Sequence, residues 1–287
     1  KGVGEYIYPT SFWVEDNQIL IYDMHLHSIF FYNKKGDFLK KIEIEKEYQG
    51  RNIAHESNNI YVDVNKFQPD KNKQFLIRRY NHKGVDQEGW LEYPKYNKGW
   101  NVLNFWVKKN FIKTKFDVKY INGLCNTVFT INNGNISPYL LIVADNEINR
   151  TDINKAQHDI KNSFGNLVKA SRKCFVGINQ YIENETTIYL RYFGYFNTQN
   201  DILYMKNTGK IQQGHLFDDI TKLESASLNN FNDEFAISVY NIRANGDISN
   251  WKQKILNGEI LLSKSNKEKV MNINNSSNPI LFFYRFR

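Results

Sequence analysis

The sequence contains little cysteine and proline and no long hydrophobic run. Its 287 residues include 2 Cys and 5 Pro. Cys125 and Cys174 lack the close spacing of a zinc-binding pair and are too few for a disulfide scaffold, so we expect two unpaired thiols. No run of about 18 apolar residues is present, and we therefore predict a soluble chain without a transmembrane segment. Because the chain begins at Lys1 rather than Met, a signal or anchor segment could have preceded it.

The positive charge of the chain is not gathered into one block of basic residues. Lys and Arg number 38 and Asp and Glu 30, a formal net charge of +8, and the basic residues are scattered as doublets such as Lys34-Lys35. Scattered basic residues argue against a nucleic-acid-binding face. The sequence also lacks a P-loop, a GxGxxG motif, a nucleophile elbow and a metalloprotease helix, which excludes the enzyme classes that depend on these motifs.

Short alternating segments separated by turns are what the sequence does contain. Residues 11–44 can be divided into four strands, with Gly36 in the turn before the fourth. The same unit recurs in residues 51–93, 101–144 and 173–214, with Gly84, Gly134 and Gly209 in the corresponding turns. Glycine suits these turns because it adopts a left-handed backbone conformation without a steric penalty.

A repeat of about 40 to 50 residues with four strands is typical of a propeller blade. We therefore predict an all-β protein, a β-propeller of four-stranded antiparallel blades that forms a single domain over residues 1–287. The apolar segment 278–287 is expected to close the ring together with the N-terminal segment. Residues 147–166 are interpreted as a long connection with at most one helical turn. A short helix is predicted within 247–260, with Ser249 as its N-cap and Gly258 as its end.

Several segments resemble an uncharacterised family of six-bladed β-propeller proteins, NHL-like in pattern, from Gram-negative gut bacteria. The resemblance rests on "GVGEYIYPTSFWVEDNQILIYDMHLHSIFFYNKKGDFLKKI" at the N-terminus, "NTVFTINNGNISPYLLI" (126–142), "LFDDI" (216–220) and "NPILFFYRF" (278–286). It implies six blades, whereas the residues themselves show four and a fifth that includes the C-terminal strand. It also implies a periplasmic or extracellular envelope protein, secreted or lipid-anchored, of unknown activity.

The stretch "DMHLHS" is the main candidate for a ligand-binding site. It contains Asp23, His25 and His27, in a loop between the second and third strands that is expected to open on the ligand-binding face of a propeller. His-x-His with a nearby carboxylate can bind a metal, but no third ligand can be named close by. The alternatives are contact with a ligand, or a plain turn in which Asp23 caps backbone amides. No catalytic residue is predicted.

Three functions remain open from sequence. The first is a monomeric binding module with a glycan, peptide or protein ligand at the loop face, for which no cofactor is expected and calcium is left open. The second is a metal-assisted hydrolase or lactonase with its site at the central channel, for which Glu15, Glu56 and Asp63 are weak candidates. Asp218 and Asp219 could also form an acid–base pair or a calcium site, although we favour a structural role. The third function, nucleic-acid binding, is the least supported.

Overall fold

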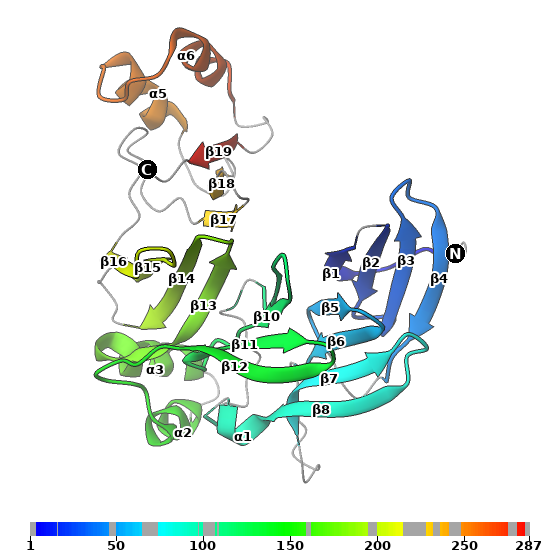
Figure 1. The fold of residues 1–287 in the computed structure, drawn as a ribbon. Coiled ribbons are helices and arrows are strands. Elements are labelled where there is room, and N and C mark those ends of the chain that lie inside the picture. Colours follow the sequence, from blue (N-terminus) through cyan, green and yellow to red (C-terminus); the bar gives the residue numbers. More distant parts are fainter. Residues whose placement is uncertain are drawn as a thin grey trace. The chain divides into compact units, whose positions relative to one another are not determined.

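The computed structural model describes most of the chain and is built mainly from antiparallel β-sheets (Figure 1). The described residues are 4–15, 17–45, 50–64, 74–96, 98–99, 107, 109–158, 162–194, 200–214, 228–231, 236–240, 248–274 and 280–284. The chain divides into two compact units, residues 1–181 with 190–200, and residues 182–189 with 201–287. The division runs through the fourth sheet.

The first three sheets belong to the first unit, and each contains four strands in chain order. The first consists of β1 (Pro9–Val14), β2 (Gln18–Asp23), β3 (Ser28–Asn33) and β4 (Phe38–Glu43). The second consists of β5 (Ile53–Glu56), β6 (Asn59–Asp63), β7 (Phe75–Asn81) and β8 (Asp86–Glu92), followed by α1 (Tyr93–Tyr96). The third consists of β9 (Phe111–Lys113), β10 (Val118–Tyr120), β11 (Thr127–Asn132) and β12 (Asn135–Leu141). The predicted repeat of four strands is confirmed in all three, although the third sheet begins at Phe111 and its first two strands divide a segment that the prediction took as one strand.

The remaining strands form a fourth and a fifth sheet. The fourth consists of β13 (Phe175–Glu183), β14 (Thr187–Gly194), β15 (Asp201–Met205) and β16 (Lys210–Gly214). The fifth has three strands, β17 (Leu228–Phe231), β18 (Ala236–Tyr240) and β19 (Ile280–Tyr284). The C-terminal strand β19 thus pairs with β18, as predicted. The described residues 4–8 form no strand, so a blade shared between the two ends of the chain is not seen in this sheet.

The turn glycines adopt the predicted conformation. Gly36, Gly84, Gly134 and Gly209 all have positive φ. Gly84 has a second constraint, because a Cβ placed there would lie 2.3 Å from the backbone oxygen of Glu43. The turn between β7 and β8 therefore approaches the end of β4 so closely that only glycine fits.

Two helices occupy the segment that we interpreted as a long connection with at most one helical turn, so that interpretation was wrong. They are α2 (Arg150–His158) and α3 (Ser163–Ala170), followed by the 3₁₀ turn Ser171–Lys173. Ile153 and Ala156 of α2 and Leu167 of α3 are buried together with Ile148 and Val176. A short helix needs only such a narrow apolar stripe when it packs against a sheet.

The helix predicted within 247–260 is confirmed as α5 (Ile248–Leu256), with Ile248, Trp251 and Ile255 buried. It begins one residue before Ser249, the predicted cap. A further helix, α6 (Lys264–Met271), was not predicted from the sequence. Its N-cap is Ser263, whose side chain accepts a hydrogen bond from the backbone N–H of Asn266 at 3.3 Å.

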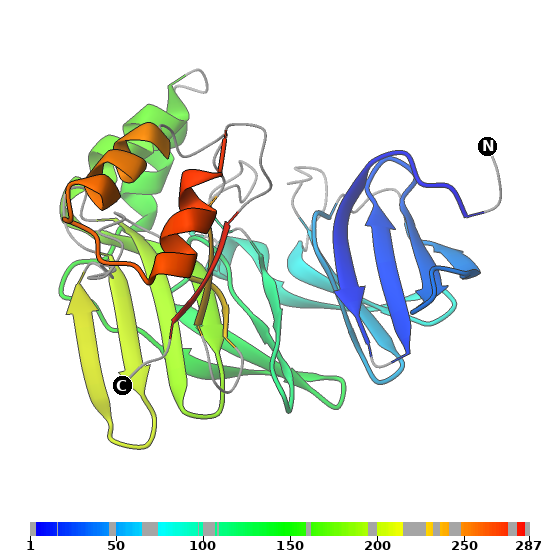
Figure 2. The ribbon, with the colours of Figure 1, turned by 90° about the horizontal axis from the view of Figure 1, so that it is seen from above.

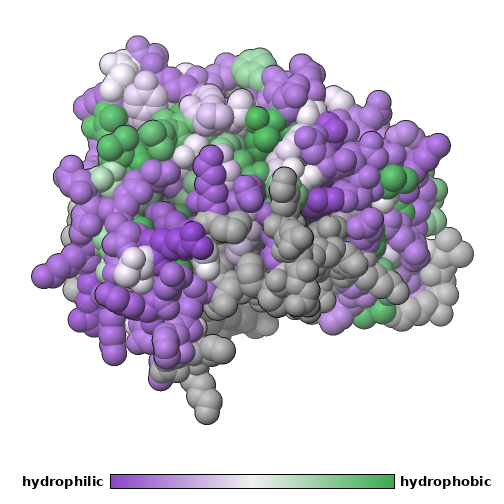
Figure 3. All heavy atoms as spheres, turned by 90° about the horizontal axis from the view of Figure 1, so that it is seen from below, coloured by the Kyte–Doolittle hydropathy of each residue, from purple (hydrophilic) through white to green (hydrophobic). Residues whose placement is uncertain are grey.

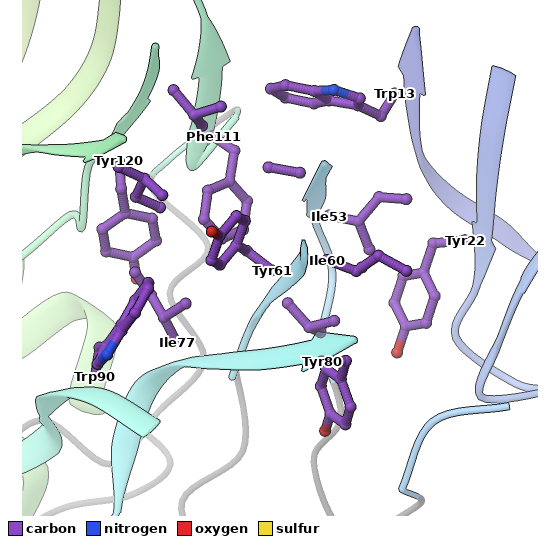
Figure 4. Close-up of a cluster of buried hydrophobic side chains, with 14 of the residues drawn as sticks. Trp13, Tyr22, Ile53, Ile60, Tyr61, Ile77, Tyr80, Trp90, Phe111 and Tyr120 are labelled. Atoms are coloured by element: carbon purple, nitrogen blue, oxygen red, sulfur yellow. The ribbon is translucent and has the colours of Figure 1, made fainter. Parts of the chain in front are cut away.

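One buried cluster joins the first three sheets. Trp13 and Tyr22 from the first sheet, Tyr61 and Trp90 from the second and Tyr120 from the third are among its members (Figure 4). The rings of Tyr61 and Trp90 are stacked with their centroids 5.5 Å apart. Because successive side chains of a strand point to opposite faces of the sheet, each of these residues lies on one face of its own sheet. The opposite face of the first sheet is more open, since Phe12 and Val14 are 66% and 46% exposed.

Candidate functional site

Asp23 ends β2 and is completely buried. One carboxylate oxygen accepts hydrogen bonds from the backbone N–H groups of His25 and Leu26, both at 2.9 Å. The other accepts from the N–H groups of Tyr8, at 2.7 Å, and Ile7. Burial alone would raise the pKa of Asp23, but these four hydrogen bonds lower it below its ordinary value. The carboxylate therefore caps the turn, as one of our alternatives held, and fixes the segment that leads into β1.

An exposed group of aromatic rings lies beside this turn. The rings of Tyr8 and His25 meet edge to face with centroids 5.1 Å apart, and Tyr6 makes a similar contact with the buried Phe30 at 6.5 Å. Tyr6 and Tyr8 are 46% and 53% exposed, and His25 is exposed as well. We call Tyr6, Tyr8 and His25 the aromatic edge. Its backbone is held by Asp23, so the rings are presented from an ordered segment.

His27 has a different position from His25. It is half-buried and has a φ of 47°, a left-handed conformation that histidine adopts more readily than most residues. Its carbonyl oxygen accepts a hydrogen bond from the N–H of Ile44 at 2.9 Å, so it anchors the end of β4. Within the part of the chain that the structure describes, no group of three or more His, Cys, Asp or Glu could hold a metal ion.

Asp63 repeats the role of Asp23 in the second sheet. It ends β6 with 1% exposure, and its carboxylate accepts from the N–H groups of Arg51 and Asn52 at 2.8 and 2.6 Å. The Asn52 amide donates to the second carboxylate oxygen at 3.2 Å and to Asn110 at 2.9 Å, which extends the network to the third sheet. Burial raises the pKa of Asp63 although these bonds oppose the shift. The buried carboxylate thus organises the entry into β5 rather than facing a ligand.

A network around Glu15 brings together side chains from three sheets; the sequence offered Glu15 as a weak candidate but not its partners His55 and Lys113. Trp13 Nε1 donates to one oxygen of Glu15 at 2.7 Å, and Lys113 Nζ donates to the other at 2.9 Å. His55 Nδ1 lies 3.7 Å from the same carboxylate. Burial alone would raise the pKa of Glu15, but Lys113 and Trp13 lower it below its ordinary value. Burial also lowers the pKa of His55, against the opposing effect of Glu15.

The third carboxylate considered for a channel site, Glu56, is also engaged within the protein. It accepts hydrogen bonds from the N–H groups of Asn133 and Gly134 at 3.0 and 3.3 Å, and from the hydroxyl of Tyr61 at 3.2 Å. These bonds connect the end of β5 to the turn between β11 and β12. The Asp218-Asp219 pair lies outside the described residues.

The Glu15 network predicts a dependence of stability on acid pH. Because the pKa of Glu15 is lower in the folded than in the unfolded chain, its ionised form stabilises the fold above the unfolded pKa of about 4.3, and this stabilisation is lost as the pH falls through the folded pKa. Between about pH 5 and about pH 3, wild type should lose about 0.5–1 kcal/mol more of its unfolding free energy than Glu15→Gln. Urea denaturation at both pH values measures the difference.

The control for this comparison is Glu43→Gln, since the Glu43 side chain is 76% exposed and its ion pair with Lys41 lies at the surface, where such pairs contribute little. It should keep the acid dependence of wild type. Equal acid dependence in wild type and Glu15→Gln would show that the network contributes nothing to stability.

Both cysteines are free and buried. Cys125 follows β10 and Cys174 precedes β13. Burial raises the pKa of each thiol above its ordinary value. Because the thiolate is the reactive form, neither residue is suited to nucleophilic chemistry at neutral pH.

The four-stranded antiparallel sheets, arranged in chain order, define an all-β protein and are consistent with a propeller-like fold. The sequence matches the family described as "Domain of unknown function (DUF4934)" over residues 1–285, and the chain belongs to that family. The expectation of an uncharacterised family is thus confirmed. No curated protein matches the sequence.

One solved structure shows a similar fold at low sequence identity. A "Putative exported protein" from Bacteroides fragilis is similar with a TM-score of 0.77 and 17% identity, over 100% of this chain and 80% of that one. Virginiamycin B lyase from Staphylococcus aureus gives a TM-score of 0.40 and 13% identity, over 72% of this chain and 55% of the lyase. Only the first of these TM-scores is high enough to indicate a shared fold, and at 17% identity the likeness concerns the fold alone. None of the described helices has the length and apolar composition needed to cross a bilayer.

Proposed function

We propose that the protein is a non-catalytic binding protein of the cell envelope, periplasmic or extracellular, that presents the aromatic edge to a glycan, peptide or protein. The observation that supports this proposal best is the presentation of Tyr6, Tyr8 and His25, with exposed rings on a segment held by the buried Asp23. Tyrosine provides a large and rigid contact area with little loss of side-chain entropy, which suits stacking on a sugar or packing on a peptide.

The state of the carboxylates supports binding over catalysis. Asp23, Asp63, Glu15 and Glu56 each accept several hydrogen bonds from the protein itself. A carboxylate that serves as metal ligand or general base needs a lone pair directed at the metal or substrate. A metal-assisted hydrolase or lactonase is therefore the less supported alternative. The envelope location is supported by the family resemblance in the sequence and by the description of the Bacteroides fragilis neighbour as exported.

For the architecture we infer a six-bladed, NHL-like ring that is closed by the N- and C-terminal segments. Support comes from apolar side chains that remain exposed at both ends of the series of sheets. Phe12 and Val14 are exposed on the first sheet, and Leu281 and Phe283 are 53% and 57% exposed on the last strand. A closed ring would remove such faces from water and leave no open sheet edge.

The test of the proposed function is binding to an immobilised glycan array and a peptide array. We expect Tyr8→Ala and His25→Ala to weaken binding about tenfold or more, because stacked aromatic contacts are worth about 0.5–1.5 kcal/mol each beyond the area they bury. Since His25 is exposed, His25→Ala should leave the free energy of unfolding within about 0.5 kcal/mol of wild type.

The matched control is Phe116→Ala, which removes a ring that is 75% exposed on the turn before β10. It should bind as wild type does. If Phe116→Ala reduces binding as much as Tyr8→Ala, the aromatic edge is not the site.

A further inference from the structure

Helices α5 and α6 come between β18 and β19 in the sequence and form a pair with its own small core (Figures 1 and 2). Ile248, Trp251 and Ile255 of α5 are buried with Ile260 of the connection and Val270 of α6. The ammonium of Lys252 donates hydrogen bonds to the carbonyl oxygens of Met271 and Ile273, at the C-terminal end of α6. A cation at this position satisfies carbonyl groups that a helix leaves unpaired, so the pair is well defined.

This helix pair is more basic than the rest of the chain. Residues 248–274 contain five Lys and two Glu and no Arg or Asp, a net charge of +3 out of +8 for the whole protein. Lys264, Lys267 and Lys269 are exposed on α6 and Lys254 is half-exposed on α5. Among the described residues, none of these four has an acidic partner within ion-pair distance. On the face seen from below in Figure 3, hydrophilic side chains predominate, with smaller hydrophobic areas between them.

Two leucines are exposed next to these lysines. Leu256 ends α5 and is 59% exposed, and Leu261 lies in the connection to α6 and is 80% exposed. Glu259 between them is exposed and is the one acidic residue of the connection. Single exposed leucines are common on protein surfaces. Two of them within six positions, flanked by Lys254 and Lys264, form the combination of apolar and basic groups that is typical of membrane-surface segments.

We propose that the helix pair is a peripheral attachment site for an anionic lipid bilayer, with Leu256 and Leu261 inserted at the interface and Lys254, Lys264, Lys267 and Lys269 near the headgroups. Each lysine close to an anionic lipid surface increases the affinity of a basic segment for that surface. Insertion of exposed leucines into the interface adds the favourable free energy of removing them from water. A nucleic acid would interact favourably with the lysines but would leave the leucines in water. An anionic membrane is therefore the better match for a surface that contains both. With nine and eight residues, α5 and α6 are too short to span a bilayer.

Co-sedimentation with vesicles tests this site in the full-length protein. The probes are vesicles of equal parts phosphatidylglycerol and phosphatidylethanolamine, and vesicles of phosphatidylcholine alone. Wild type should sediment with the anionic vesicles and not with the neutral ones. The triple variant Lys264→Gln, Lys267→Gln, Lys269→Gln should lose about fivefold in affinity per removed charge at low salt, about a hundredfold in total. Raising the salt concentration should weaken wild type and have a smaller effect on the variant.

Two further variants distinguish a membrane from a nucleic acid, and the helix pair from basic residues elsewhere in the chain. Leu256→Ser with Leu261→Ser should lower vesicle binding at least tenfold while leaving binding to a DNA duplex unchanged. The charge-matched control Lys34→Gln, Lys35→Gln, Lys83→Gln removes three exposed lysines from other turns and should bind vesicles as wild type does. Thermal melts confirm that each variant is folded. Equal losses in the control and in the α6 variant, or a double-leucine variant that binds as wild type, would overturn the proposal.

Discussion

Truncating the chain at Ser277 should cause the C-terminal sheet to unfold and the protein to aggregate. The deletion removes β19, which pairs with β18 over five residues from Ala236–Tyr284 to Tyr240–Ile280. What remains of the fifth sheet is the ribbon of β17 and β18, and an isolated two-stranded ribbon is marginally stable at best in water. The deletion also exposes the backbone edge of β18, which invites pairing with other chains. Scanning calorimetry and size-exclusion chromatography would show the loss of a transition and the appearance of aggregates.

A shorter truncation serves as the control. Ending the chain at Tyr284 keeps β19 intact and should leave melting and elution unchanged. If the protein ending at Ser277 melts like the parent, β19 is dispensable, and both the sheet pairing and the proposed ring closure lose their support.

Replacing Asp63 by Ala should be the most destabilising single substitution among the polar residues considered. It removes a buried carboxylate, and so leaves the partly buried N–H groups of Arg51 and Asn52 and the Asn52 amide without their acceptor. A fully buried donor that loses its acceptor costs about 1–3 kcal/mol, and three partly buried donors lose theirs here, so we expect a loss of about 3 kcal/mol in total in the free energy of unfolding. Urea denaturation at neutral pH measures this loss.

Two comparisons make the test specific. Asp63→Asn keeps one oxygen acceptor and should be destabilised less than Asp63→Ala. Asp37→Ala changes an exposed aspartate whose carboxylate accepts from the Asn33 amide at 2.7 Å, and it should cost less than about 1 kcal/mol. A loss for Asp63→Ala that is no larger than for Asp37→Ala would mean that the buried carboxylate does not organise the entry into β5.

The strands could be predicted because their determinants are local. Alternating side chains and a glycine turn with positive φ, as at Gly36 and Gly84, occur within a few residues of one another. Helices α2 and α6 were missed because few of their residues are apolar, with Val270 the one buried residue in α6. Their stability depends on burial of these few side chains, which a local pattern does not reveal.

In the candidate site, too, only the contacts between residues close in sequence could be predicted. The capping role of Asp23 could be anticipated because the N–H groups of His25 and Leu26 follow it directly in the chain. The hydrogen bonds from Ile7 and Tyr8 to Asp23 form only because the segment before β1 folds back against the turn after β2. The aromatic edge depends on these bonds, and the sequence does not show them. The contacts of Glu15 with His55 and Lys113 could not be predicted from the sequence, because these residues come from three sheets and approach one another only when the sheets pack.

We expect the protein to bind its ligand at the aromatic edge without changing it chemically. The most direct measurement is mass spectrometry of glycans from the array panel that are retained by immobilised wild-type protein, in parallel with Tyr8→Ala. We expect the retained glycan to be recovered intact after prolonged incubation and to be absent from the Tyr8→Ala sample. Recovery of a cleaved or otherwise altered glycan, or equal retention by Tyr8→Ala, would contradict the claim.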